Sequence, residues 1–348
     1  MIMAISIVAC GAANRVVGQS VSASEAVLEV VSSGNLDHDS LIYMGRIEAA
    51  LLASGLGSSP SALEERLDAL WEARYTSEGG GPGWGLPYSW DAFRDGTTNP
   101  VDTIYTYTTA MAALAFLDGY IAQGRTVYLE RAKAAVNTIL EDCWGFEEGM
   151  HKSVWYSDQR QDQVGKDYVV HNVNALTLAA LSRITRYEAR TYAPEKTAGI
   201  EAMLVDHAGY EGVEGQWQYQ IGGPNRNDLV HHAYIALGLV EAGLPEAETA
   251  LRYMWMEWFD DLTGAFDTTN REVMGSTSWG PGDALLPLTA AEDWQSQARL
   301  LTEQIVTTVD GDGVPTVADL KQPRSMVRYG LGPALFAARA VGVKGLFP

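Results

Sequence analysis

Five Gly- and aromatic-rich loops, each followed by an apolar helix, recur along this chain of 348 residues. The loops occupy residues 83–88, 154–158, 215–219, 264–267 and 310–313, and the helices after them begin near Val101, Val170, Asp228, Gly282 and Ser325. These starts lie about 69, 58, 54 and 43 residues apart, which fits one helical hairpin plus a loop. Sequential hairpins that share a core form a solenoid or a closed ring. Polar and aromatic residues collect at one end of each unit, where we expect the functional site.

Each repeat pairs a helix that is apolar on almost every side with an amphipathic one. The predicted pairs are residues 39–53 with 61–75, 101–122 with 127–140, 170–187 with 194–208, 228–242 with 245–259, and 282–290 with 291–309; a last helix, 325–341, has no partner after it. An all-apolar helix is buried, and one with a charged stripe faces solvent. We therefore predict an all-α ring of about six hairpins, inner helices alternating with outer ones. Short β-hairpins should be limited to loops such as 217–221. Residues 1–35 form an N-terminal arm, and 36–348 form one toroid domain.

The composition excludes several classes of partner. The formal net charge is −20 and the pI about 4.6, so nucleic acid and anionic membranes are repelled. No stretch approaches the roughly 18 apolar residues of a membrane span. High acidity leans weakly toward a secreted or cell-envelope setting. The sequence calls for no cofactor and no metal.

The two cysteines cannot form a disulfide framework or a four-ligand zinc site. We expect Cys143, at a helix end, to be a buried thiol. The run before Cys10 loosely matches a lipid-attachment box but lacks a preceding Lys or Arg. An extended apolar arm over residues 1–8, packed on the body or supporting self-association, is the favoured interpretation.

Three stretches resemble a known group of folds: residues 83–90 (GWGLPYSW), 170–174 (VHNVN), and 217–219 (WQY) with 227–232 (NDLVHH). They resemble the (α/α)6 toroids found with polysaccharide synthesis and degradation, including glucuronyl C5-epimerase-like proteins, uronate lyases and six-hairpin glycosidases. The likeness spans about residues 71–240. It implies a carbohydrate ligand on the loop face, and it leaves the reaction open.

The predicted site residues gather where inner helices begin. A helix start offers free N–H groups and a positive dipole end, which suit an anionic group such as a uronate carboxylate. The polar candidates there are His171, Asn172, Asn174, Asn227, Asp228, His231 and His232. Because consecutive residues point about 100° apart on a helix, at most one of His231 and His232 should reach the site. Asn99 and Asp228 can also serve simply as N-caps.

Tyrosines and other aromatic residues add to this set. Tyr105 and Tyr107 lie beside Asp102 in the first turns of the second inner helix, and Arg328 holds the same position on the last one. Arg is a natural fork for a carboxylate. The residues that could stack on sugars are Trp84, Tyr88, Trp90, Trp155, Tyr156 and Trp217. Packing is the alternative role for each of them.

Two chemistries fit these residues. In uronate elimination or epimerisation, His171 or His232 would act as base and Tyr105 or Tyr107 as acid. Inverting hydrolysis needs two carboxyl groups roughly 6.5–9.5 Å apart. Its candidates are Asp91, Asp102, Asp228 and Asp283. The fuller Asn/His/Tyr/Arg set favours the first, and a non-catalytic glycan-binding or assembly subunit is the third possibility.

Other motifs are weaker. The pair Asp260–Asp261 lacks the fuller acidic motif of a diphosphate–Mg²⁺ site. Asp310, Asp312 and Asp319 fall at positions 3, 5 and 12 of a calcium loop, but position 1 is Thr308. Zinc-protease, α/β-hydrolase and P-loop signatures are absent from the sequence.

Overall fold

The structure is a computed structural model that describes residues 38–54, 58–91, 96–148, 151–159, 169–222, 227–260, 265–266 and 280–307. The predicted N-terminal arm with Cys10, the last helix with Arg328 and the calcium-like loop with Asp310, Asp312 and Asp319 lie outside these residues.

Five helical hairpins follow one another along the described chain, as the repeat predicts. They are α2 (His38–Ser54) with α3 (Pro60–Glu72), α4 (Thr106–Gln123) with α5 (Thr126–Asp142), α6 (His171–Thr185) with α7 (Pro194–Asp206), α8 (Leu229–Ala242) with α9 (Glu246–Trp258), and α10 (Gly280–Ala290) with α11 (Gln295–Thr307). Two short 3₁₀ turns, η2 (Tyr210–Gly212) and η3 (Glu292–Trp294), lie between helices.

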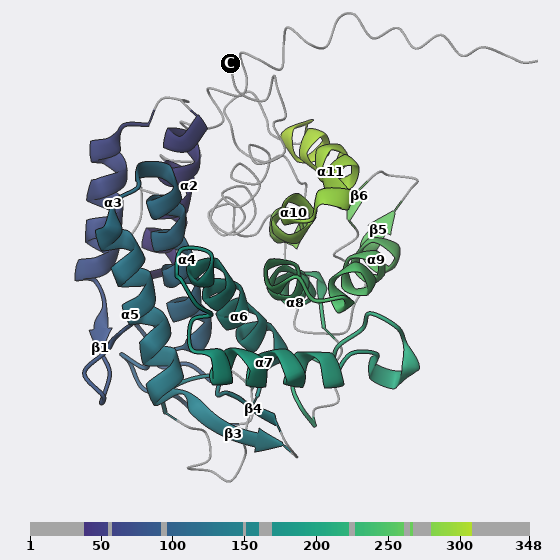
Figure 1. Cartoon of the computed structure of the whole chain (residues 1–348), viewed down its shortest axis with the longest axis horizontal. Helices are drawn as coiled ribbons and strands as arrows, with labels where there is room; N and C mark the ends of the chain where they lie inside the picture. The colour runs from purple at the N-terminus through teal and green to yellow at the C-terminus, as the bar shows by residue number, and fades with distance from the viewer. Residues whose placement is uncertain are drawn as a thin grey trace, which may run out of the picture.

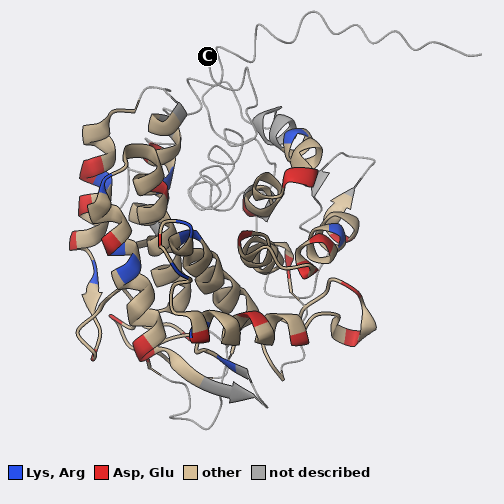
Figure 2. Cartoon of the chain, in the orientation of Figure 1, with Lys and Arg blue, Asp and Glu red and all other residues tan. Residues whose placement is uncertain are grey.

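The hairpins form two layers around a central axis. Each inner helix contacts the next, in the order α2, α4, α6, α8, α10, and each outer helix packs behind its inner partner (Figure 1). Charged side chains lie mainly on the outer helices (Figure 2). This division of apolar and amphipathic helices confirms the predicted ring architecture.

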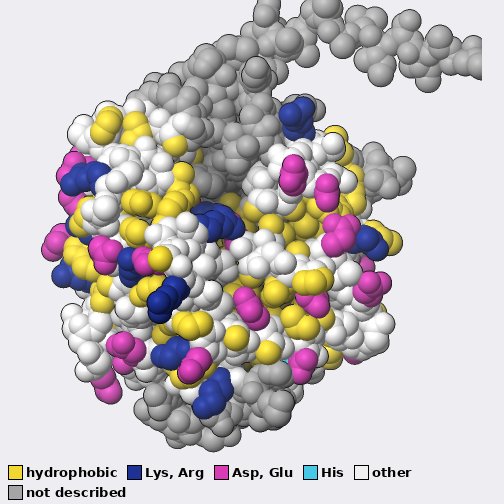
Figure 3. All heavy atoms as spheres, viewed as in Figure 1, with side chains coloured by type: hydrophobic (Ala, Val, Ile, Leu, Met, Phe, Trp, Pro, Cys, Tyr) yellow, Lys and Arg dark blue, Asp and Glu magenta, His cyan; other side chains and the backbone are white. Residues whose placement is uncertain are grey.

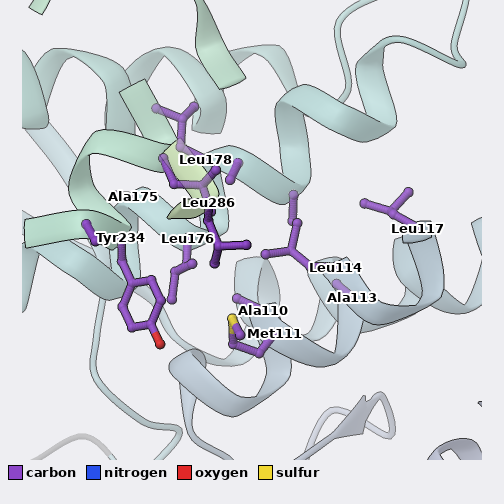
Figure 4. Packing of buried hydrophobic residues seen from close by; sticks show 14 of the residues in the cluster. Ala110, Met111, Ala113, Leu114, Leu117, Ala175, Leu176, Leu178, Tyr234 and Leu286 are labelled. Carbon is purple, nitrogen blue, oxygen red and sulfur yellow. The ribbon is translucent and has the colours of Figure 1, made fainter. Parts of the chain in front are cut away.

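Small side chains let the inner helices approach one another closely. Ala and Leu side chains of α4 and α6 meet Tyr234 of α8 and Leu286 of α10 in the centre of the core (Figure 4). A Cβ atom at Gly238 of α8 would lie 2.4 Å from the backbone oxygen of Ala175 on α6. Glycine is therefore required at this crossing.

The second inner helix begins later than the sequence predicts. The structure starts α4 at Thr106 rather than near Val101, with Tyr105 in the cap position. Asn99 does not cap this helix, because its backbone pairs with Trp90 in an isolated antiparallel bridge. Ile104 pairs likewise with Gly85. These two bridges fix residues 99 and 104 against the loop before them, with a turn at residues 101 and 102 between them.

Two buried tryptophans fix corresponding loops to the helices before them. The indole N–H of Trp84 donates to the carbonyl of Leu70, and that of Trp217 donates to the carbonyl of Leu204. Both indoles are fully buried. The same residue type thus makes the same bond in two repeats.

Short antiparallel hairpins lie in the loops between helices. They pair β1 (Tyr75–Thr76) with β2 (Pro82–Gly83), β3 (Trp144–Glu148) with β4 (His151–Val154), and β5 (Phe259–Asp260) with β6 (Ala265–Phe266). Among the described residues, the predicted hairpin segment 217–221 carries no assigned strand, and Gln220 forms an isolated bridge with Val170 at the start of α6.

A buried network of charges joins four inner helices toward their C-terminal ends. Asp118 of α4 accepts from Arg46 of α2 at 2.8 Å and from Arg183 of α6 at 2.9 Å. Arg183 also meets Glu241 of α8 at 2.8 Å, and Arg186 bonds to the same carboxylate. On the face seen in Figure 3, one group of Lys and Arg side chains lies near the centre, and the others are spread among Asp and Glu.

Cys143 is a free, fully buried thiol, as predicted. Among the described helices, none has the length and apolar character needed to cross a membrane.

Candidate functional site

The N-terminal ends of α4 and α6 meet in a largely aromatic cluster that we call the mouth, and His231 of α8 packs against it through Tyr219. Val170, Val173 and Tyr219 form its buried part, and Tyr107 and Tyr156 pack on them, partly buried. These residues come from α4, from the start of α6 and from two loops. The structure thus brings together residues far apart in the sequence at the end where the site was predicted.

At the start of α8, Asp228 holds His231. One carboxylate oxygen of Asp228 accepts from the backbone N–H of His231 at 2.9 Å and lies 2.7 Å from its ring Nδ1. Burial opposes ionisation of Asp228, but the attraction and hydrogen bonds of His231 outweigh it and lower its pKa. The His231 side chain is 22% exposed and packs edge-on against Tyr219. With Nδ1 directed at the carboxylate, Nε2 is the ring atom left to exchange a proton with a ligand.

Below the mouth, four side chains from four inner helices are linked through hydrogen bonds. The hydroxyl of Tyr107 lies 3.1 Å from that of Tyr43 on α2 and 3.3 Å from that of Tyr234 on α8. Tyr234 in turn donates to Asp283 of α10 at 3.1 Å. Burial raises the pKa of Asp283 well above its usual range. The pKa values of Asp228 and Asp283 are therefore shifted in opposite directions although both groups are buried.

Two asparagines near the mouth have an amide oxygen with no hydrogen-bond partner among the described residues. These are Asn172 in the first turn of α6 and Asn227 just before α8, both more than nine-tenths buried. The second carboxylate oxygen of Asp228 likewise has no hydrogen-bond partner among the described residues. The amide nitrogen of Asn227 donates to the carbonyls of Trp217 and Gln218, which fixes its oxygen on the other side. Buried acceptors of this kind suit a ligand with hydroxyl donors, because leaving them unpaired costs about 1–3 kcal/mol each.

The loop before α4 contributes the exposed aromatic residues. Tyr88 is 50% exposed and Trp90 38% exposed, and their rings meet edge to face. Tyr105 packs on Tyr156, and burial raises its pKa to about 12, with the nearby Asn99 side chain opposing that shift. Burial also raises the pKa of Asp158, which accepts from the backbone of Ile104.

The two histidines predicted as bases lie in surroundings that do not suit that role. His171 is buried, with Nδ1 against the carbonyl of Gln218 and Nε2 2.8 Å from His207. Burial and then the neighbouring His207 lower its pKa to about 3. His232 is enclosed by Trp217, Tyr253 and Trp258, and burial lowers its pKa to about 4. Of the adjacent pair, His231 is the one that reaches the mouth.

Other predicted residues are bound into the framework. Trp84 and Trp217 have no exposed surface on which a sugar could stack. Asn174 makes three hydrogen bonds to the backbone of Val154 and Val170. Asp91 accepts from the backbone of Gly96, and Asp102 is exposed with a left-handed backbone. Within the described residues, no cluster of three or more metal-ligating side chains occurs.

Sequence reasoning missed Tyr43, Tyr219 and Tyr234. Tyr234 lies three residues after His231 and so shares its helix face, which was a usable signal. Tyr43 sits in a run of apolar residues with nothing to distinguish it, and only the packing of α2 against α4 brings its hydroxyl to Tyr107.

No protein-family model and no curated protein matches the sequence. Solved structures match it over most of its length. A glycoside hydrolase family 76 α-mannanase from Bacteroides thetaiotaomicron is 15% identical, with 93% of this chain and 96% of that one covered, at a TM-score of 0.65. A cellobiose 2-epimerase from Bacillus thermoamylovorans is 13% identical, with 87% and 88% covered, at 0.56. An α-amylase from Clostridium perfringens is 11% identical, with 86% of both chains covered, at 0.57. These likenesses, together with the layered hairpins, show that the chain has the (α/α)6 toroid fold.

Proposed function

We propose that this protein is a carbohydrate-active enzyme that binds an oligosaccharide across the mouth and transfers protons at one of its sugars. The observation that carries the proposal is the Asp228–His231 pair, whose imidazole is ordered, partly exposed and next to Tyr219. The neighbours in fold named as hydrolases and sugar epimerases support a carbohydrate as the ligand.

The mouth holds the parts that such a ligand needs. Tyr88 and Trp90 offer exposed rings for sugar faces, and the orphaned oxygens of Asn172, Asn227 and Asp228 accept from sugar hydroxyls. The positive dipole end at the start of α6 favours an anionic substituent. A uronate-containing glycan combines hydroxyls, apolar ring faces and a carboxylate.

The favoured chemistry is elimination or epimerisation at the carbon beside the uronate carboxylate. His231 takes the proton from that carbon through Nε2, while Asp228 stabilises the imidazolium that forms. Tyr107 gives a proton to the leaving oxygen in elimination, or to the opposite face of the carbon in epimerisation. Tyr219 packs on His231 and belongs to the same cluster as Tyr107, so His231 and Tyr107 both lie at the mouth.

Inverting hydrolysis is the second candidate, favoured by the contrast between Asp228 and Asp283. Interactions with His231 keep Asp228 ionised against its burial, whereas burial favours the protonated form of Asp283. Two carboxyl groups with opposite pKa shifts are the pattern of a base and an acid.

Product analysis on a panel of uronate and neutral polysaccharides in deuterated water tests the proposal. Elimination yields an unsaturated uronate that absorbs ultraviolet light, hydrolysis yields new reducing ends alone, and epimerisation incorporates deuterium without either. His231→Gln and Tyr107→Phe should each lower the rate about 100-fold or more. Tyr128→Phe, which removes a buried hydroxyl on outer helix α5, is the control that keeps the rate. A wild type that gives no product in any of the three assays would contradict the proposed catalysis, and glycan binding without catalysis would then be the remaining function.

A further inference from the structure

The linked side chains below the mouth connect a partly exposed tyrosine to a fully buried carboxyl group. Tyr107, in the first turn of α4, is the member that reaches the mouth, where it packs on the aromatic cluster. Tyr234 of α8 stands between it and Asp283 of α10, with contacts of 3.3 and 3.1 Å. The rings of Tyr107 and Tyr234 pack with centroids 5.8 Å apart, which holds the first contact in place.

Asp283 occupies an unusual position for a carboxyl group. It has no exposed surface, and its second oxygen has no hydrogen-bond partner among the described residues. A carboxyl group so placed is costly unless it is neutral or fully paired. A purely structural role would be served better by an apolar residue of similar size.

The charges around Asp283 come from three directions. Tyr234 and the positive charge of Arg46 on α2 favour its ionised form, and the negative charge of Asp228 disfavours it. On the adjoining turn η3, Glu292 and Asp293 are exposed. Arg46 is itself held by Asp118 at 2.8 Å. Burial therefore opposes ionisation of Asp283, and the positive charge of Arg46 stabilises the carboxylate when the proton is lost.

We propose that Tyr234 and Asp283 form a proton relay that returns a proton to Tyr107 after each turnover. This inference rests on the proposed function, in which Tyr107 is the acid. It assigns Tyr234 and Asp283 as positioning residues that act through Tyr107 and do not touch the sugar.

The transfer balances along the chain. As the bond from the sugar carbon to the leaving oxygen breaks, that oxygen takes the hydroxyl proton of Tyr107. Tyr107 then takes the proton of Tyr234, and Tyr234 takes the proton of Asp283, which becomes a carboxylate favoured by the positive charge of Arg46. The 3.1 Å contact serves both states, because the protonated carboxyl donates to Tyr234 and the carboxylate accepts from it. When product leaves, the proton that His231 removed returns through solvent and the same hydroxyls.

The relay makes a specific claim about pH. Asp283 can supply a proton to the relay while it is protonated. This supply is lost as the pH rises through the raised pKa of Asp283. Asp283→Asn and Tyr234→Phe both cut the path, so each should lower kcat about tenfold or more and leave KM within about twofold. Each should also abolish the alkaline limb of the kcat profile that Asp283 sets. Tyr128→Phe is the matched control, because it removes another buried tyrosine hydroxyl far from the mouth.

The experiment is kcat and KM against pH for these four proteins, with thermal unfolding to confirm that each is folded. Infrared spectra of the same proteins supply a readout that needs no substrate. The wild type should show a protonated-carboxyl band that is missing in Asp283→Asn and displaced in Tyr234→Phe. An active wild type whose Tyr234→Phe variant keeps both kcat and the pH profile overturns the relay alone. So does the absence of that band. A folded wild type inactive on every glycan overturns the proposed function, and the relay with it.

Discussion

At the scale of single residues, burial decides which histidines can act. His171 and His232 are both fully enclosed, and their pKa values fall from 6.5 to about 3 and about 4. Both stay neutral in the folded protein, whereas in the unfolded chain they take up protons below about pH 6.5. The stability that their neutral burial contributes is therefore fully present above that pH, and it declines as the pH falls toward 4.

His232→Phe tests this linkage. The wild type should lose up to about 1.4 kcal/mol of unfolding free energy per pH unit for each such histidine between pH 6 and 4.5. Phe fits an apolar site and cannot titrate, so the slope of stability against pH should drop by about one proton. Urea unfolding at several pH values measures it. An unchanged slope would mean that His232 is accessible to protons in the folded state.

The sequence predicted a site where the inner helices begin, and it left open which histidine reaches the mouth. The run His231–His232 shows that one of the two side chains can face the site. The structure decides which one, because His232 packs against Trp217 and Trp258 and leaves His231 toward the mouth. Trp84 and Trp217 have the same composition signal as Trp90, yet only Trp90 is exposed. Side-chain burial depends on neighbouring repeats, and local composition cannot report it.

At the scale of elements, apolar periodicity was enough to locate the hairpins. Helices α3, α5, α7 and α9 begin within one residue of the predicted positions, because Pro60, Gly124, Pro194 and Pro245 mark their starts. The start of α4 was predicted five residues too early, since the bridges of Trp90 with Asn99 and Gly85 with Ile104 are long-range pairings. Cap residues alone could not reveal them.

Gly238→Ala tests the closest approach of α6 and α8. The added Cβ would lie 2.4 Å from the carbonyl oxygen of Ala175, and backbone cannot move aside as a side chain can. We expect a loss of about 3 kcal/mol of unfolding free energy, the upper end for overpacking. Gly243→Ala, at a left-handed position with open space, should cost only about 1 kcal/mol. Chemical unfolding compares them, and a Gly238→Ala variant as stable as wild type would contradict this crossing.

At the scale of the whole molecule, the ring has two different ends. Polar groups with unpaired oxygens lie at the mouth, whereas the carboxylates of Asp118 and Glu241 are fully engaged with Arg46, Arg183 and Arg186 toward the other end. We infer that the second set joins α2, α4, α6 and α8 and leaves the mouth to a ligand. The repeat predicted the ring, but no local motif predicted this network, because its members come from four different repeats.

Asp118→Asn tests whether the buried ion-pair network stabilises the packing of the inner helices. Two arginines would lose their shared carboxylate in a buried site, so the unfolding free energy should fall by about 3–5 kcal/mol. The matched control is Asp68→Asn, which breaks the surface pair with Arg131 and should cost about 1 kcal/mol or less. Denaturant unfolding measures both variants. Equal effects would show that the network adds no more than a surface ion pair.

The most direct test of the account is a crystal structure of the His231→Gln variant with an oligosaccharide identified by the product assays. We predict that a sugar lies across the N-terminal ends of α4, α6 and α8, with hydroxyls bonded to Asn172 or Asn227 and the scissile bond beside Tyr107. An oligosaccharide bound at the other end of the ring, or on the outer helices, would contradict the account.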